Sequence, residues 1–146
     1  MMNFEDFNEL VQKVKSDHPI WFGIEPDEIP DDTTIRLAEE KLYTQLPDDY
    51  INFILEYGGG YFAFSNVFSL QERSDFNLVY LNYKYDAVDS GYVLFSENNS
   101  GDIFGFKTVD GICEPKIHFY DHEIEIWQES QYCNLFDYLE KVALSN

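Results

Sequence analysis

Acidic side chains are the groups in this sequence most able to do chemistry, and they are densest in residues 25–32. That stretch holds five carboxylates and no basic residue. Grouped carboxylates attract a basic partner and speed the encounter with it, although a solvated loop with helix-capping acids has the same composition. We predict a partner-binding surface with these acids, extended by two from the start of a later helix: Glu25, Asp27, Glu28, Asp31, Asp32, Asp48 and Asp49.

Other carboxylates raise the question of catalysis, but their patterns favour structural roles. Gly101-Asp102 could set a catalytic aspartate beside a flexible glycine. A turn in which Asp bonds nearby backbone amides is the stronger interpretation, because no matched base is evident. Asp121, Glu123 and Glu125 alternate with isoleucines, which indicates the solvated face of a strand and not a pair of catalytic carboxylates. We therefore predict no catalytic residue and no enzymatic activity.

The cysteines and histidines do not match a metal site. The candidate ligands share no compact zinc-binding spacing and include no C-x-x-C pair: Cys113, His118, His122 and Cys133. The glycine run at 58–60 follows a helical stretch instead of opening one, so it ends that helix and is not a phosphate loop. We predict neither a metal nor another cofactor.

Aromatic residues are unusually frequent, with 13 Phe and 11 Tyr in 146 residues. This number exceeds what the inward face of one sheet needs, and aromatic side chains are enriched at the energetic centres of protein interfaces. The alternative is that the surplus packs beneath residues 66–90. We expect Tyr61, Tyr83 and Tyr85 at a partner-binding surface.

Charge limits the class of partner. Nine Lys and Arg residues against 28 Asp and Glu residues give a net charge of −19. This charge repels phosphate backbones and anionic lipid head groups, so we expect no nucleic acid and no membrane as a partner. A basic protein fits the charge, unless the acidity only keeps the protein in solution. The first residues lack a basic region followed by an apolar stretch, so we also expect a cytoplasmic protein with reduced thiols.

The elements that position these groups follow from the hydrophobic period. Helical spacing predicts helices over residues 3–16, over 34–44 with Asp32 or Thr33 as the cap, from Pro47 to the glycines, and over 131–144. The alternating segments predicted as strands are 61–70, 92–97, 102–108, 117–120 and 123–127, with 76–86 either strand or irregular. This order predicts one α+β domain over residues 1–146, with N-terminal helices, an antiparallel meander sheet of about five or six strands and a C-terminal helix.

Four short motifs, in this order, resemble the SUKH superfamily, which is named for the fungal Smi/Knr regulators. They are Leu46-Pro47-Asp48-Asp49-Tyr50 followed by the glycine run, the Gly101-Asp102 turn before a strand, the turn that contains His122, and Leu135-Phe136-Asp137-Tyr138-Leu139. The resemblance covers residues 33–144. It implies a Smi/Knr-like fold with the signature residues Leu46, Pro47, Tyr50, Gly58, Gly59, Gly101, Asp102 and His122.

The resemblance also implies a non-enzymatic domain that binds protein partners. Stand-alone bacterial members of the superfamily are immunity proteins that neutralise toxins, often nucleases, by stoichiometric binding. A basic toxin domain is the partner that this implies here, and it agrees with the charge. Fungal and viral members are regulators or hubs, so a regulatory adaptor is the alternative. Nothing in the sequence indicates an oligomeric state.

Overall fold

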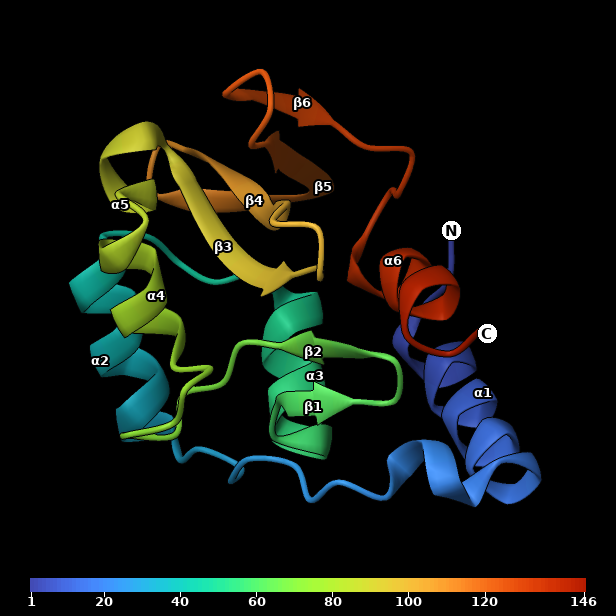
Figure 1. The fold of residues 1–146 in the computed structure, drawn as a ribbon. Coiled ribbons are helices and arrows are strands. Elements are labelled where there is room, and N and C mark those ends of the chain that lie inside the picture. Colours follow the sequence, from blue (N-terminus) through green and yellow to red (C-terminus); the bar gives the residue numbers. More distant parts are fainter.

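The computed structural model describes all 146 residues and contains six α-helices, a short 3₁₀ helix (η1) and six strands (Figure 1). Helices precede the first strand and a helix follows the last, as predicted. All strand pairs are antiparallel, which confirms the α+β class. In chain order the elements are α1 Phe4–Asp17, η1 Pro19–Phe22, α2 Asp32–Leu42, α3 Asp48–Tyr57, β1 Gly60–Phe62, β2 Ser65–Val67, α4 Leu78–Lys84, α5 Ala87–Ser90, β3 Tyr92–Glu97, β4 Ile103–Val109, β5 Ile112–Asp121, β6 Ile126–Glu129 and α6 Leu135–Val142.

Residues just before the helices decide where α2 and α3 begin. Asp31 accepts hydrogen bonds from the backbone N–H and the hydroxyl of Thr34, both at 2.8 Å, and so caps α2. The predicted caps Asp32 and Thr33 were wrong, because this double contact starts the helix two residues earlier than expected. Pro47 was predicted as the first residue of the third helix, but it lies just before it with an extended ψ of 148°, and α3 begins at Asp48.

The strands form two sheets. β3, β4, β5 and β6 make a four-stranded meander, and β1 pairs with β2 in a separate hairpin. The observed strands agree with the predictions 92–97 and 102–108 to within one residue. The predicted strand 61–70 is instead two strands of three residues each, because Ala63 adopts a left-handed φ of 49° and turns the chain back.

The connection between β5 and β6 differs from the prediction. The segment 123–127 was expected to be a strand, but Glu125 has a φ of 57° in a turn, and β6 starts only at Ile126. Ile124 and Ile126 are 56% and 51% exposed, so neither is buried beneath a sheet face. The alternation of acids and isoleucines therefore belongs to a solvated turn, and Asp121, Glu123 and Glu125 do not share one strand face.

Residues 76–86, ambiguous in the sequence, contain helix α4. Asn82 on this helix is fully buried, and its side chain joins the helix to the edge strand β3. Its amide donates to the carbonyl of Leu94 at 3.0 Å, and its oxygen accepts the N–H of Leu94 at 2.7 Å. Edge strands carry unpaired backbone groups that must be satisfied or covered. One asparagine satisfies both groups of Leu94.

Aromatic rings fill the space between the terminal helices and the sheets. α1 and α6 lie side by side, and α3 lies behind the β1–β2 hairpin in Figure 1. The ring of Phe7 on α1 lies 6.2 Å from Phe53 of α3 and 4.9 Å from Phe136 of α6. Tyr138 of α6 packs edge-on against Phe95 of β3 at 5.2 Å. Much of the aromatic surplus is thus core, and no helix has both the length and the apolar character that crossing a bilayer requires.

Candidate functional site

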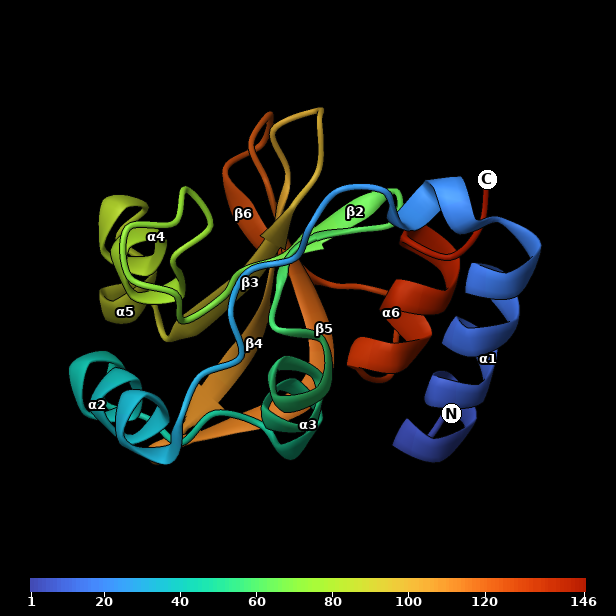
Figure 2. The same cartoon turned by 90° about the horizontal axis from the view of Figure 1, so that it is seen from below.

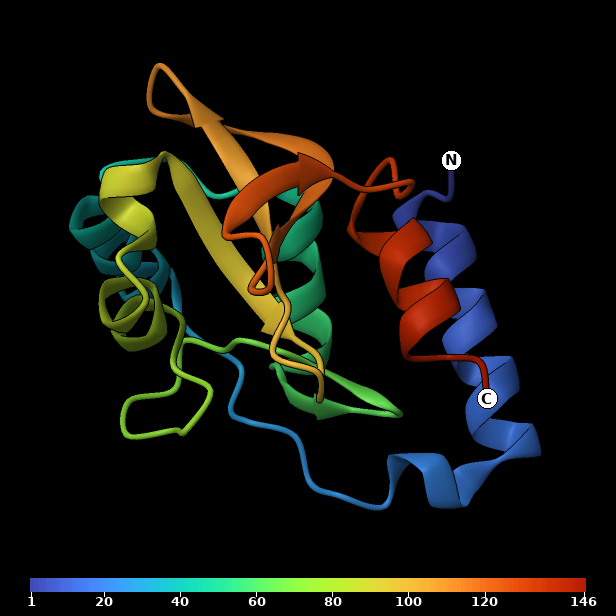
Figure 3. The ribbon, with the colours of Figure 1, turned by 45° about the horizontal axis from the view of Figure 1, so that its top comes forward.

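Residues 23–31, called the acidic strap below, form an extended segment that joins η1 to α2. The strap runs past the β1–β2 hairpin from the α1 side of the molecule to the α2 side (Figures 2 and 3). Two hydrogen bonds hold its backbone. The N–H of Asp27 donates to the carbonyl of Gly59 at 2.8 Å, and the N–H of Glu28 donates to the side-chain oxygen of Gln71 at 2.7 Å. The strap therefore has a fixed path without regular secondary structure.

The side chain of Asp27 anchors the strap to the body of the protein. Its Oδ2 accepts hydrogen bonds from the hydroxyls of Ser69 at 2.7 Å and Ser74 at 2.5 Å. The close approach depends on glycine: a Cβ on Gly58 would lie 2.0 Å from the carbonyl oxygen of Asp27, and one on Gly60 would lie 2.9 Å from its Cγ. The glycine run thus ends α3, as predicted, and also makes room for the strap. The Asp27 carboxylate is committed to these internal contacts.

The outward side of the strap combines carboxylates with exposed apolar groups. Glu25 and Glu28 are exposed. Ile24, which precedes Glu25, is 60% exposed, and Ile29, which follows Glu28, is 57% exposed. Tyr61 of β1, 51% exposed, shares a small cleft of about 70 Å³ with Ile24. We call these five residues the strap face. Three of the predicted partner-binding residues, Glu25, Glu28 and Tyr61, are exposed and belong to this face.

The remaining predicted acids lie elsewhere. Asp31 caps α2, and the backbone N–H that it accepts holds the pKa of its carboxyl below the usual value. Asp32 and Asp48 line an open groove of about 580 Å³ between α2 and α3. Asp49 is half-buried, and its burial, with the charges of Asp48 and Asp137, raises its pKa. The predicted acids therefore do not form one continuous cluster.

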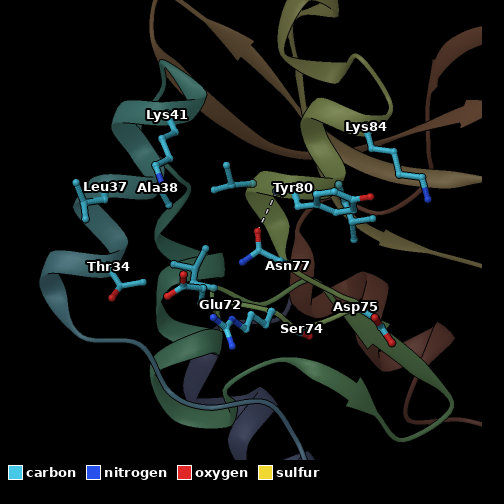
Figure 4. A pocket seen from close by; sticks show the side chains of 14 residues that line it. Thr34, Leu37, Ala38, Lys41, Glu72, Ser74, Asp75, Asn77, Tyr80 and Lys84 are labelled. Atoms are coloured by element: carbon cyan, nitrogen blue, oxygen red, sulfur yellow. Dashed lines mark hydrogen bonds between the residues drawn. The ribbon is translucent and has the colours of Figure 1, made fainter.

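A hollow of about 930 Å³ lies where α2, α4 and the loop of residues 71–77 meet (Figure 4). We call it the α2–α4 groove. The hydroxyl of Tyr83 donates to the backbone carbonyl of Lys41, which ties the end of α4 to the end of α2. Tyr85 is 40% exposed just beyond α4, and Tyr80, which lines the groove, is 62% exposed. Tyr80 belongs to the same segment, 76–86, as Tyr83 and Tyr85, but it was not among the residues predicted at the partner-binding surface.

The groove has a charge unlike that of the rest of the chain. It is lined by three of the nine basic residues but by only two of the 28 acidic ones. No lysine or arginine anywhere in the protein forms an ion pair, since the one such contact joins His122 to Asp102. Each of these cations is isolated in the sequence, so only the fold brings Lys41, Arg73 and Lys84 to one hollow.

The signature residues at the start of α3 have structural roles. Leu46 and Pro47 are buried, and the N–H of Leu46 donates to a side-chain oxygen of Glu39 at 2.7 Å. Tyr50 is fully buried, and its hydroxyl donates to the carbonyl of Phe68 at 2.6 Å. Burial raises the pKa of this hydroxyl far above its usual value. These contacts leave no free polar group for a ligand.

The other signature residues join two turns of the meander. Gly101 has a φ of 90°, and Asp102 lies 3.0 Å from Nδ1 of His122. This hydrogen bond holds the pKa of Asp102 below its usual value. A hydrogen bond from the backbone of His122 also lowers the pKa of Asp102, and the side chain of Asn98 accepts the N–H of Asp102 at 3.0 Å. Ligand atoms of Asp102, Asp121 and His122 lie within 4.8 Å of one another, and the contact between the two turns accounts for this.

The cysteines occupy different environments. Cys113 is buried, its Sγ lies 3.7 Å from the hydroxyl of Thr44, and burial raises the pKa of its thiol to about 11. Cys133 is exposed, and neither residue forms a disulfide. A thiol with a raised pKa is a poor nucleophile at neutral pH, so the Cys113 site does not support thiolate chemistry.

A family model described as SMI1-KNR4 cell-wall (SUKH_6) matches residues 32–139. The matched range starts with α2, ends within α6 and contains all the signature residues and the whole α2–α4 groove. The acidic strap precedes it. No curated protein matches the chain.

Proposed function

We propose that this chain, which belongs to the SMI1-KNR4 (SUKH) family, is an immunity protein that neutralises a toxin domain by binding it in the cytoplasm. The family consists in general of non-catalytic protein-binding domains. Protein binding is therefore the starting point, and the identity of the partner is the proposed part. The partner that the charge favours is a basic domain, such as a nuclease.

The strap face is the observation that carries this proposal. Its backbone is held by hydrogen bonds at Asp27 and Glu28, so little ordering is needed when a partner binds. Glu25 and Glu28 are presented beside three large exposed apolar side chains. Desolvated apolar anchors surrounded by charges form the usual pattern of a specific protein interface.

The proposed mechanism is occlusion of the toxin. A nuclease cleft is basic because it must hold phosphate, so carboxylates of the strap face would occupy it in place of the nucleic acid. Ile24, Ile29 and Tyr61 would supply the desolvated contacts that keep the complex together. The net charge of −19, with no lysine or arginine paired to a carboxylate, would accelerate the encounter.

A regulatory adaptor is the second candidate, and the α2–α4 groove favours it. An adaptor needs surfaces for more than one partner, and the groove differs from the strap face in charge and in position. An immunity protein needs only one such surface.

The test is binding to toxin-like domains encoded beside the gene, measured with purified proteins. We expect a one-to-one complex that protects cells, and we expect Glu25→Lys with Glu28→Lys to weaken it about 100-fold, because both charges meet the basic cleft. The matched control is Glu5→Lys with Glu9→Lys, which makes the same charge change at exposed positions of α1. If no neighbouring domain binds, the immunity proposal is wrong. If both double variants bind alike, the strap face is not the surface that binds the toxin.

A further inference from the structure

The α2–α4 groove contains unpaired cations in a chain that is otherwise acidic. Lys41 lies in the last turn of α2, and Lys84 lies in the last turn of α4. Figure 4 shows Lys41 extending along the groove and Lys84 on the side of α4 that faces away from α2. Arg73 belongs to the loop before α4, and all three line the hollow without an ion pair.

The side chains of Thr34, Ser74 and Asn77 in the groove are already engaged. The hydroxyl of Thr34 donates to Asp31, and the hydroxyl of Ser74 donates to Asp27. The amide of Asn77 donates to the carbonyl of Gln71 at 3.0 Å, and its oxygen accepts the N–H of Tyr80 at 2.9 Å. The side-chain donors that no hydrogen bond engages are the three cations and the hydroxyl of Tyr80, and the cations favour a ligand with carboxylates.

Apolar groups lie between the two charged ends. Leu37 is 47% exposed on α2, and Tyr80 is 62% exposed on α4. Thr34 and Glu72 mark one end of the groove in Figure 4, and Lys41 marks the other. From position 34 to position 41 the helix rises about 10 Å, at about 1.5 Å per residue. An acidic ligand that lies along α2 would therefore span about 10 Å between the two ends, with an apolar group between its anionic groups.

We propose that the α2–α4 groove binds an acidic peptide segment of a protein partner, which places one carboxylate at Lys41, a second at Arg73 and an apolar side chain against Leu37 and Tyr80. In a helical segment, acids seven positions apart have this spacing, about 10 Å. Lys84 adds a third positive charge on the far side of α4. The site is distinct from the strap face and takes a ligand of the opposite charge, so it goes beyond the immunity proposal.

The experiment uses the full chain and a fluorescent twelve-residue helical peptide with two glutamates seven positions apart and leucines between them. We expect saturable binding by anisotropy, weakened about tenfold by raised salt. We also expect Lys41→Glu with Arg73→Glu to abolish it. Amide shifts in the NMR spectrum should fall on α2 and α4. A control with the same charge change elsewhere, Lys13→Glu with Lys141→Glu, should bind normally, because both lysines are exposed on the terminal helices.

Three results would overturn this inference. The first is equal binding of the same peptide with lysines in place of the glutamates, which would assign the groove to a basic partner. The second is equal competition by free glutamate, which would indicate a site for a small anion. The third is retention of binding in the groove variant. None of these results depends on whether a toxin binds the strap face, so the two proposals fail separately.

Discussion

Asp27 and Glu28 are adjacent in the chain, yet they have opposite uses. The carboxylate of Asp27 is turned inward to two serine hydroxyls, whereas the side chain of Glu28 is exposed and only its backbone N–H is engaged. Both were predicted to contact a partner because both belong to one acidic run. The difference arises from Ser69 and Ser74, which are more than forty positions away. Orientation, and not residue type, decides which carboxylates can meet a partner.

Asp102 allows a test at the scale of one residue. Its folded-state pKa is lowered by the hydrogen bond to His122, so its contribution to stability is present above the unfolded pKa of about 3.9 and is lost as the pH falls through the folded value. Because the pair is partly exposed, we expect Asp102→Asn to lower the free energy of unfolding at pH 7 by about 0.2–1 kcal/mol. The loss should vanish near pH 2, as measured by urea unfolding across this range.

The control for this measurement is Asp89→Asn, at an exposed position of α5. It should change the stability little at any pH in the series. An Asp102→Asn deficit that is as large at pH 2 as at pH 7 would contradict the role assigned to the carboxylate.

The glycine run between α3 and β1 is the element that connects the fold to the strap face. Its left-handed backbone ends the helix, and its missing Cβ atoms let the strap lie against the hairpin. Asn82 has a similar connecting role between α4 and the edge of the sheet. In both cases the residue type is explained by contact with another segment of the chain: the strap for the glycines and β3 for Asn82.

Alanine substitutions at two glycines distinguish the cost of backbone strain from the cost of a steric clash. Gly58 and Gly111 have φ values of 82° and 75°, but a Cβ on Gly111 would meet nothing within 4 Å. Alanine at Gly111 should therefore cost only the left-handed strain, about 1–2 kcal/mol. Gly58→Ala adds the clash with the strap, so we expect a loss roughly twice as large. Equal losses in thermal or urea unfolding would show that the strap is not held as described.

Gly58→Ala should also loosen the acidic strap. Because the added Cβ displaces the strap at Asp27, we expect faster hydrogen exchange at residues 25–28 in this variant and unchanged exchange there in Gly111→Ala. This comparison distinguishes a displaced strap from a general loss of stability.

At the scale of the whole molecule, charge is the dominant property. A net charge of −19 is not relieved by any lysine or arginine ion pair, so the folded state carries substantial self-repulsion. Three of the few cations are placed in one groove, which leaves other surfaces still more acidic. The protein thus presents two surfaces of different character, the strap face and the α2–α4 groove.

Salt should therefore stabilise this protein. Raising NaCl from about 20 mM to about 0.5 M shortens the screening length to a few ångströms, and we expect the free energy of unfolding to rise on the order of 1 kcal/mol. A variant with Glu5, Glu9, Glu25 and Glu28 all changed to Gln should gain less. Destabilisation by salt, or the same gain in both proteins, would contradict net self-repulsion.

The sequence by itself determined the α+β class, the apolar stripes of the first three helices, two of the meander strands and the acidic character of the surface. These properties depend on periodicity and on contacts within a few positions, and both can be predicted from the order of the residues. Only the tertiary structure decided that Asp27 faces inward and that Lys41 and Arg73 share a groove. The reason is physical: these outcomes depend on contacts between segments separated by tens of residues, and no local pattern encodes them.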